Sequence, residues 1–186
     1  AQQIASIDAF TTYYARQINS GSDDQVADAR NNLIEPVGRQ GISEPFRLAF
    51  ANSVVTQLKS AFVSDRIIVK MNIMIVAGQL ADKSVLGLIA SGLADPNPAV
   101  RYWAARAAAT TAAKSALARP DRVILMNALV GQMVLEGGGD QQSARIEGSQ
   151  QVLKQILLAL GELNLPEARS EEYTSELQSP CNLVCR

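Results

Sequence analysis

The 186-residue chain contains no histidine. This absence excludes histidine acid/base catalysis, Ser-His and Cys-His nucleophile pairs, and histidine-ligated metal sites. Aromatic residues make up only 5% of the chain, too few for the base-stacking platforms that bind single-stranded nucleic acids. The 17 basic and 18 acidic residues nearly cancel, so the net charge is -1. We therefore expect no nucleic-acid partner and no attraction to an anionic membrane surface.

Long hydrophobic runs are also absent. The most apolar stretch, Ile67–Ala77, is interrupted by Lys70 and Asn72 and falls well short of the roughly 20 residues needed to span a bilayer. The hydrophobic content of 47% nevertheless suits a folded chain of this length. We expect one soluble domain with no membrane insertion.

Cysteine occurs only at Cys181 and Cys185, inside the final segment RSEEYTSELQSPCNLVCR, residues 169–186. The first eleven residues of this segment resemble RSEEHTSELQS, the conceptual translation of a sequencing-adapter oligonucleotide, and differ from it only at Tyr173. The resemblance implies that residues 169–186 are an appended, unstructured artefact, and that a C-terminally truncated natural domain spans residues 1–168. Residues 1–168 then contain neither cysteine nor histidine, so we expect no metal and no cofactor.

The start of the chain leaves the location of the protein open. Ala1-Gln2-Gln3 is the kind of sequence left when a secretory signal is cleaved after a small residue. Export is one interpretation, and a clipped record of a cytoplasmic protein is the other. The lack of cysteine in residues 1–168 is compatible with both.

Apolar residues recur at helical spacing throughout the chain, and no stretch shows the period of two typical of a strand. Helix starts are predicted at residues suited to N-terminal caps, namely Ser22, Ser43, Asp65, Asp82 and Asn97. Pro98 follows Asn97 at the first helical position, which proline prefers, and this sixth helix is predicted to reach about Ala118. We predict an all-α domain of about eight helices, with consecutive helices paired as antiparallel hairpins.

The sixth helix carries a recognisable pattern. In LGLIASGLADPNPAVRYWAARAAA, residues 86–109, Asp-x-x-Pro-x-Val-Arg opens the helix and alanines follow three and four residues apart. This pattern resembles a HEAT-like repeat. The residues that carry the resemblance are Asp95, Pro98, Val100, Arg101, Ala104 and Ala108. It implies that Asp95 and Arg101 belong to a polar ladder between successive repeats, and that Val100 and the alanines fill the core.

A weaker copy of the pattern lies 31 residues earlier, where Val69-Lys70-x-Asn72 corresponds to Val100-Arg101-x-Trp103. A period near 31 suits a two-helix repeat. The alanines of the sixth helix would also let neighbouring helices approach towards the lower end of the usual 8–10 Å. We therefore predict hairpins stacked as a short HEAT-like α-solenoid, with an irregular helical bundle as the alternative.

Several sequence features that could mark a site suit a structural role better. Gly137-Gly138-Gly139 lacks the strand and the Gly-Lys-Ser/Thr ending of a phosphate-binding loop. The acids Asp23, Asp24 and Asp28 lack EF-hand spacing and suit a helix N-terminus. The densest basic run consists of Arg101, Arg106, Lys114, Arg119 and Arg122. Helical geometry points Arg106 and Lys114 away from Arg101, so the run does not form one basic face. Trp103 is predicted to lie in the core, whereas the sequence does not decide between burial and exposure of Tyr102.

No catalytic, cofactor-binding or metal-binding residue follows from the sequence. Stacked helical hairpins expose a long surface that typically binds proteins or peptides. We therefore expect a non-catalytic scaffold or protein-interaction module with a protein or peptide partner. The alternative is the non-catalytic helical portion of a larger enzyme. An enzyme complete within this chain would need Asp, Glu, Lys, Ser or Tyr alone, and no constellation of these residues is evident.

Overall fold

The computed structural model describes residues 2–137 and 146–163. Within these residues the chain is helical and contains no strand, so the predicted all-α fold is confirmed. The α-helices are α1 (Gln2–Ser20), α2 (Asp23–Gly38), α3 (Glu44–Ala61), α4 (Ile67–Leu80), α5 (Leu86–Leu93), α6 (Pro98–Lys114), α7 (Arg119–Gly137) and α8 (Ile146–Leu163), with a short 3-10 helix η1 (Lys83–Val85) before α5. The predicted appended segment, residues 169–186, and most of the triple-glycine stretch lie outside the described residues.

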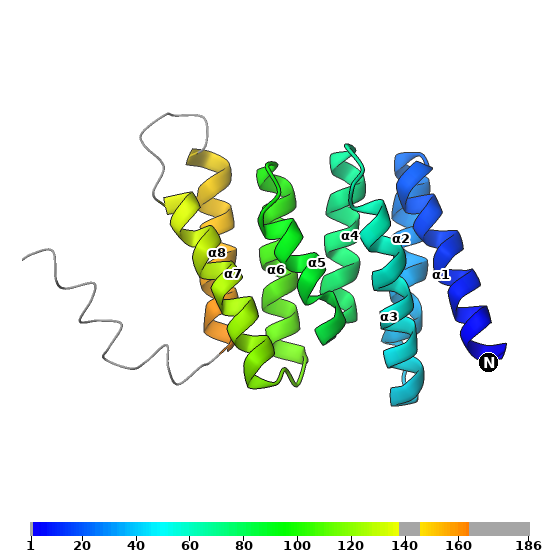
Figure 1. The fold of residues 1–186 in the computed structure, drawn as a ribbon. Helices are drawn as coiled ribbons and strands as arrows, with labels where there is room; N and C mark the ends of the chain where they lie inside the picture. Colours follow the sequence, from blue (N-terminus) through cyan, green and yellow to red (C-terminus); the bar gives the residue numbers. More distant parts are fainter. Residues whose placement is uncertain (1, 138–145, 164–186) are drawn as a thin grey trace, which may run out of the picture.

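The eight helices form two layers (Figure 1). One layer contains α2, α4, α6 and α8, each packed against the next, and the other contains α1, α3, α5 and α7. The colours of Figure 1 show that the odd-numbered helices run in one direction and the even-numbered helices in the other. Consecutive helices therefore pair as antiparallel hairpins, as predicted, and the hairpins lie side by side in one row.

Most of the predicted helix starts are confirmed. Ser22 and Gln25 form a reciprocal capping box at α2, and Ser43 caps α3. Asn97 accepts a hydrogen bond from the backbone N–H of Ala99 at the start of α6, where Pro98 occupies the first position. Asp82 caps η1 through the backbone N–H of Ser84. These side chains satisfy backbone donors that a helix start leaves unpaired.

Two predicted boundaries are wrong. Arg66, not Asp65, precedes the first residue of α4 and has an extended backbone. Its side chain donates hydrogen bonds to the carbonyl oxygens of Asn19 and Gly21. Helix α6 ends at Lys114, before the predicted Ala118, because Ser115 is extended and turns the chain so that Leu117 is buried.

The burial pattern repeats between α4 and α6. The two helices begin 31 residues apart, at Ile67 and Pro98. Buried positions of α4 correspond at this spacing to buried positions of α6, in the pairs Val69/Val100, Ile73/Ala104, Met74/Ala105, Val76/Ala107, Ala77/Ala108 and Leu80/Thr111. Both helices therefore use the same faces to pack, although α4 fills them with large side chains and α6 with alanines.

The prediction for Trp103 needs correction. Its indole is only partly buried against the core, and the Arg106 guanidinium lies 5.0 Å from the ring centre. Tyr102 is also partly buried and meets Trp103 edge to face, with ring centres 5.7 Å apart. The fully buried positions of α6 are held by Val100, Thr111 and four alanines, and the large indole lies beside this set.

Among the described helices, none combines the length and the apolar character that crossing a bilayer requires.

Candidate functional site

Asp95 joins α4 to the start of α6. It lies in the turn before α6, and its side chain is only 4% exposed. One carboxylate oxygen accepts a hydrogen bond from Lys70 Nζ at 2.9 Å, and the other accepts one from the backbone N–H of Asn97 at 2.8 Å. The Lys70 ammonium also lies 5.5 Å from the centre of the Phe62 ring. Both carboxylate oxygens of this buried side chain therefore have a hydrogen-bond partner, as a buried polar group requires.

Arg101 joins the start of α6 to α7. Its Nε donates a hydrogen bond to Glu136, and its Nη1 donates to the carbonyl oxygens of Asp95 and Pro96 at 3.0 and 2.8 Å. Glu136 also accepts hydrogen bonds from Gln132 Nε2, at 2.8 Å, and from the Ser149 hydroxyl of α8. One carboxylate therefore links α6, α7 and α8.

The Glu136 carboxylate is almost enclosed, with its side chain 3% exposed. Burial by itself would raise the pKa of this carboxyl. The hydrogen bonds from Arg101, Ser149 and Gln132, together with the Arg101 charge, outweigh burial and hold the pKa below its ordinary value. A carboxylate that accepts this many hydrogen bonds is a poor proton acceptor, so the geometry indicates a structural role.

A third polar contact joins α2 to α4. Arg30 Nη1 donates to Asn72 Oδ1 at 3.0 Å, and Asn72 Nδ2 donates to the carbonyl oxygen of Ile68 at 2.8 Å. Polar side chains thus connect neighbouring members of the even-numbered layer. Sequence reasoning singled out Asp95 and Arg101 but missed Arg30, Glu136 and Ser149, because their partners are distant in sequence and no local motif marks them.

The other signature residues have packing positions. Val100, Ala104 and Ala108 are fully buried, and the ring of Pro98 contacts α8 near Gly148. No side chain of the signature faces an open cleft among those described below. The structure therefore brings Asp95 and Arg101 together through backbone and side-chain hydrogen bonds and places the remaining signature residues in the helix interfaces.

The acidic residues near Asp23 and the basic residues of the run from Arg101 to Arg122 do not form a common site. Asp23 pairs with Arg66 at 3.2 Å, and within the described residues no group of three metal-binding side chains lies close enough to hold an ion. In the basic run, Arg106 covers Trp103, and Arg122 donates to the carbonyl oxygens of Leu117 and Leu163. These arginines serve separate intramolecular contacts.

A cleft of about 330 Å³ opens between α1, α2 and α3. Its apolar wall contains Phe10, Phe46 and Phe50, which are three of the chain's four phenylalanines. The rings of Phe46 and Phe50 stack with centres 5.7 Å apart, and Phe10 lies 6.1 Å from Phe50. The polar side chains around the cleft are Ser6, Asn32, Glu35 and Arg39. We call this site the aromatic cleft.

A second cleft, of about 430 Å³, lies where the C-terminal ends of α2, α4 and α6 meet the start of α3. Its charged side chains are Glu44, Arg47, Asp82 and Lys114, two of each sign, so it has no preference for one sign of ligand. The aromatic cleft offers the more specific surface, because it combines an apolar wall with hydrogen-bonding groups.

Comparisons with protein-family models, curated proteins and solved structures found no match to this chain.

Proposed function

We propose that this chain is a HEAT-like helical-repeat module that binds a protein or peptide and has no catalytic activity of its own. The two-layer row of hairpins and the shared burial pattern of α4 and α6, 31 residues apart, support the repeat interpretation. The buried polar contacts at Asp95 and Glu136 support it too, because they join the hairpins that contain α4, α6 and α8. A row fixed in this way is a rigid platform on which a binding surface can be pre-organised.

The observation that carries the binding proposal is the aromatic cleft. Aromatic residues are scarce in this chain, yet three phenylalanines meet around one opening. Phe50 is only 2% exposed, so the accessible aromatic surface of the cleft comes from Phe10 and Phe46, which are partly buried. Aromatic side chains are enriched at protein interfaces. The volume suits one or two apolar side chains of a peptide, and Asn32 and Ser6 offer hydrogen-bonding groups beside them. The expected ligand is therefore a short peptide segment with an apolar anchor residue.

The proposal is tested by selecting peptides from a random displayed library on the full chain and measuring their affinity by calorimetry. The informative variant is Phe46→Ala, because Phe46 is only partly buried and its loss removes one wall of the cleft. The matched control is Leu48→Ala on the same helix, since Leu48 is 42% exposed and does not line the cleft.

We expect selected peptides to carry an aromatic or large aliphatic residue and to lose about tenfold in affinity on Phe46→Ala. Leu48→Ala should change the affinity by less than about twofold. Circular dichroism and thermal unfolding of both variants establish that they remain folded. A library that yields no binder, or binders that respond equally to the two variants, overturns the proposal.

A further inference from the structure

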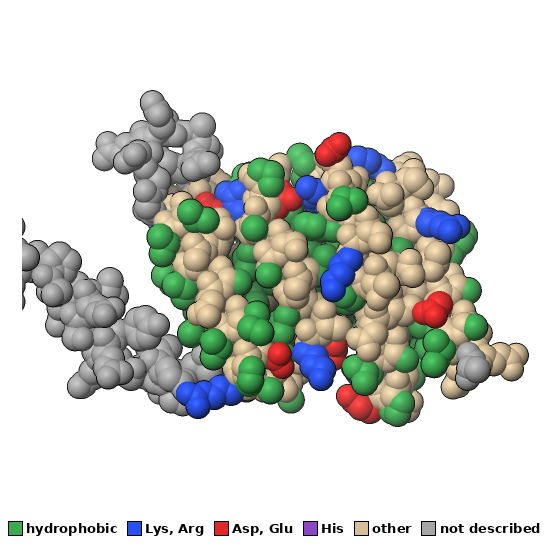
Figure 2. All heavy atoms as spheres, viewed as in Figure 1, with side chains coloured by type: hydrophobic (Ala, Val, Ile, Leu, Met, Phe, Trp, Pro, Cys, Tyr) green, Lys and Arg blue, Asp and Glu red, His purple; other side chains and the backbone are tan. Residues whose placement is uncertain are grey.

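The outward face of α7 is apolar. Seven residues from Val123 to Leu135 are exposed, and none of them is charged. They are Val123, Ile124, Asn127, Val130, Gly131, Val134 and Leu135. Figure 2 shows hydrophobic side chains along the edge of the molecule that carries α7. Uncharged surface of this extent is uncommon on a protein that works alone.

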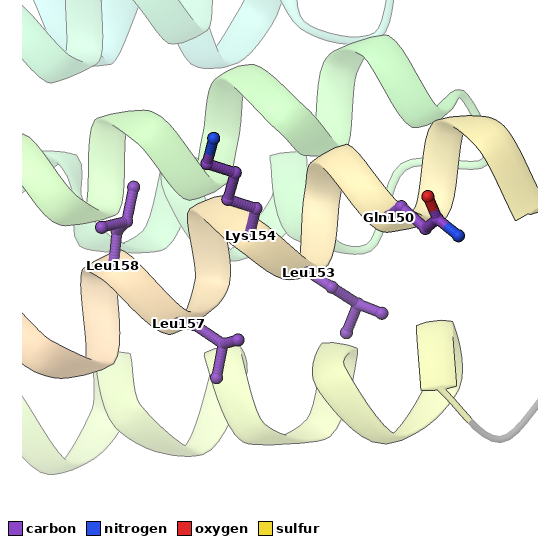
Figure 3. A pocket seen from close by; sticks show the side chains of 5 residues that line it. All are labelled: Gln150, Leu153, Lys154, Leu157 and Leu158. Carbon is purple, nitrogen blue, oxygen red and sulfur yellow. The ribbon is translucent and has the colours of Figure 1, made fainter.

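Helix α8 continues this face. Leu157 is 60% exposed and Leu158 is 53% exposed. Leu153, Leu157 and Leu158 line a shallow, open depression together with Gln150 and Lys154. Figure 3 shows Leu153 and Leu157 pointing to the side of α8 where α7 lies, and Leu158 and Lys154 pointing to the other side. We call the seven α7 residues named above and the exposed residues of α8 together the terminal face.

The opposite end of the row is different. The surface of α1 carries Asp8 and Arg16 beside Tyr13, and α2 exposes Asp24 and Asp28. This end thus combines exposed charges with the exposed Ile4 and Tyr13, and charged outer residues are typical of the end of a helical stack. Among the described residues, the terminal face carries only Lys154 and Glu162 as charged residues, so the two ends of the row are chemically unequal.

The register of the even-numbered helices shows what the terminal face resembles. Helices α4, α6 and α8 begin at residues 67, 98 and 146, so Gly78, Ala109 and Leu157 occupy corresponding positions. Gly78 is buried, because α6 lies directly against it at Ala107. Leu157 is the corresponding position with no described helix in front of it. Among the described residues, no helix packs on the terminal face in the way that α6 packs on Gly78.

We propose that the terminal face binds the terminal face of a second copy of this chain in a closed two-fold dimer. A two-fold axis perpendicular to α8 makes the two α8 helices antiparallel. If the axis passes near Leu158, Lys154 of each chain faces Glu162 of the partner subunit, because these residues lie four positions before and after Leu158 on one helical row. Lys154 and Glu162 thus complement each other across the two-fold axis, and the seven α7 residues of the terminal face carry no charge.

Size and chemistry agree with a second copy as the occupant. Two helices of about 18 residues that lie side by side offer roughly 500 Å² of flat area. This is on the scale of the ~800 Å² of accessible surface that each partner buries in a standard interface. Docking of the terminal face on the α1–α2 end would instead join unlike surfaces, and such a head-to-tail contact adds further chains unless its rotation closes a ring. In a two-fold dimer both chains use the same face, so no free copy of that face remains to bind a third chain.

The mass of the full chain is measured by sedimentation velocity and light scattering between about 1 and 100 µM, the range in which a dimer of moderate affinity assembles. A reductant is present so that Cys181 and Cys185 cannot link chains. We expect the mass to rise to that of two chains and stop there. Leu157→Glu should leave a folded monomer, whereas Val63→Glu, at a position 84% exposed before α4, should dimerise as the wild type does.

A charge swap tests the geometry. Lys154→Glu should raise the dimer dissociation constant about tenfold, because two like-charge pairs replace two favourable ones. The double variant Lys154→Glu/Glu162→Lys should return it to within about threefold of the wild type. A wild-type chain that stays monomeric, a mass that keeps growing with concentration, a dimer insensitive to Leu157→Glu, or a double variant no better than Lys154→Glu overturns the proposal.

Discussion

Gly78 of α4 lies directly against Ala107 of α6. A Cβ atom placed on Gly78 would be 3.1 Å from the Ala107 Cα and 3.2 Å from its Cβ. The neighbouring atoms belong to a backbone and to the shortest side chain, and neither can turn aside. The small residues of this contact therefore set how closely two helices of the even-numbered layer approach.

Gly78→Leu should destabilise the fold by about 3 kcal/mol or more, because the added side chain forces α4 and α6 apart. The gain in helix propensity, about 1 kcal/mol, is too small to compensate. Gly87→Leu is the matched control, since Gly87 is an exposed residue of α5 and a Cβ there meets nothing within 4 Å. Urea unfolding of the two variants should give opposite shifts of the midpoint. Equal shifts would show that the approach of α4 and α6 does not depend on Gly78.

The Glu136 carboxylate should make stability depend on pH. Its pKa is lowered in the folded protein, so the folded state holds its proton less tightly than the unfolded chain does. The resulting stabilisation is complete above the unfolded value of about 4.3 and is lost as the pH falls through the lower folded-state value. Glu136→Gln should cost about 3 kcal/mol at neutral pH, because it leaves the largely buried Arg101 charge without its partner.

The measurement is the difference in unfolding free energy between wild type and Glu136→Gln at neutral pH and at about pH 3, where this difference should shrink. Glu35→Gln is the control, because the Glu35–Arg39 pair is exposed on both sides and should contribute little to stability at either pH. A Glu136→Gln difference that is the same at both pH values would contradict a contribution from the ionised carboxylate.

Local sequence was sufficient for much of the fold. Asn97 and Pro98 mark the start of α6 through their own backbone preferences, and the spacing of Val100, Ala104 and Ala108 identifies the buried face before any partner is known. Trp103 shows the limit of that reasoning. Its size favours burial, but the space available depends on how closely neighbouring helices pack.

The polar contacts and clefts were less predictable. Arg101 and Glu136 are 35 residues apart, and Ser149 reaches the same carboxylate from another helix, so their meeting depends on the stacking of whole hairpins. The aromatic cleft has the same origin. Phe46 and Phe50 are one helical turn apart on α3, but Phe10 joins them only because α1 packs on α3. No residue type or local spacing carries that information.

Thr111 has a buried hydroxyl that makes no hydrogen bond to any described residue. An unpaired hydroxyl in an apolar site costs free energy, so Thr111→Val should stabilise the fold by about 1 kcal/mol while filling nearly the same space.

Thr11→Val provides the matched control for Thr111→Val. Thr11 is also fully buried, but its hydroxyl lies 2.7 Å from the Ser53 hydroxyl and 3.2 Å from the carbonyl oxygen of Asp8. Removing it should destabilise the fold by about 1 kcal/mol, because Ser53 then loses one of its buried partners. The two substitutions delete the same atom at the same degree of burial, so the sign of each change in the urea midpoint depends on the hydrogen bonds alone. Destabilisation by both would mean that the Thr111 hydroxyl has a partner after all.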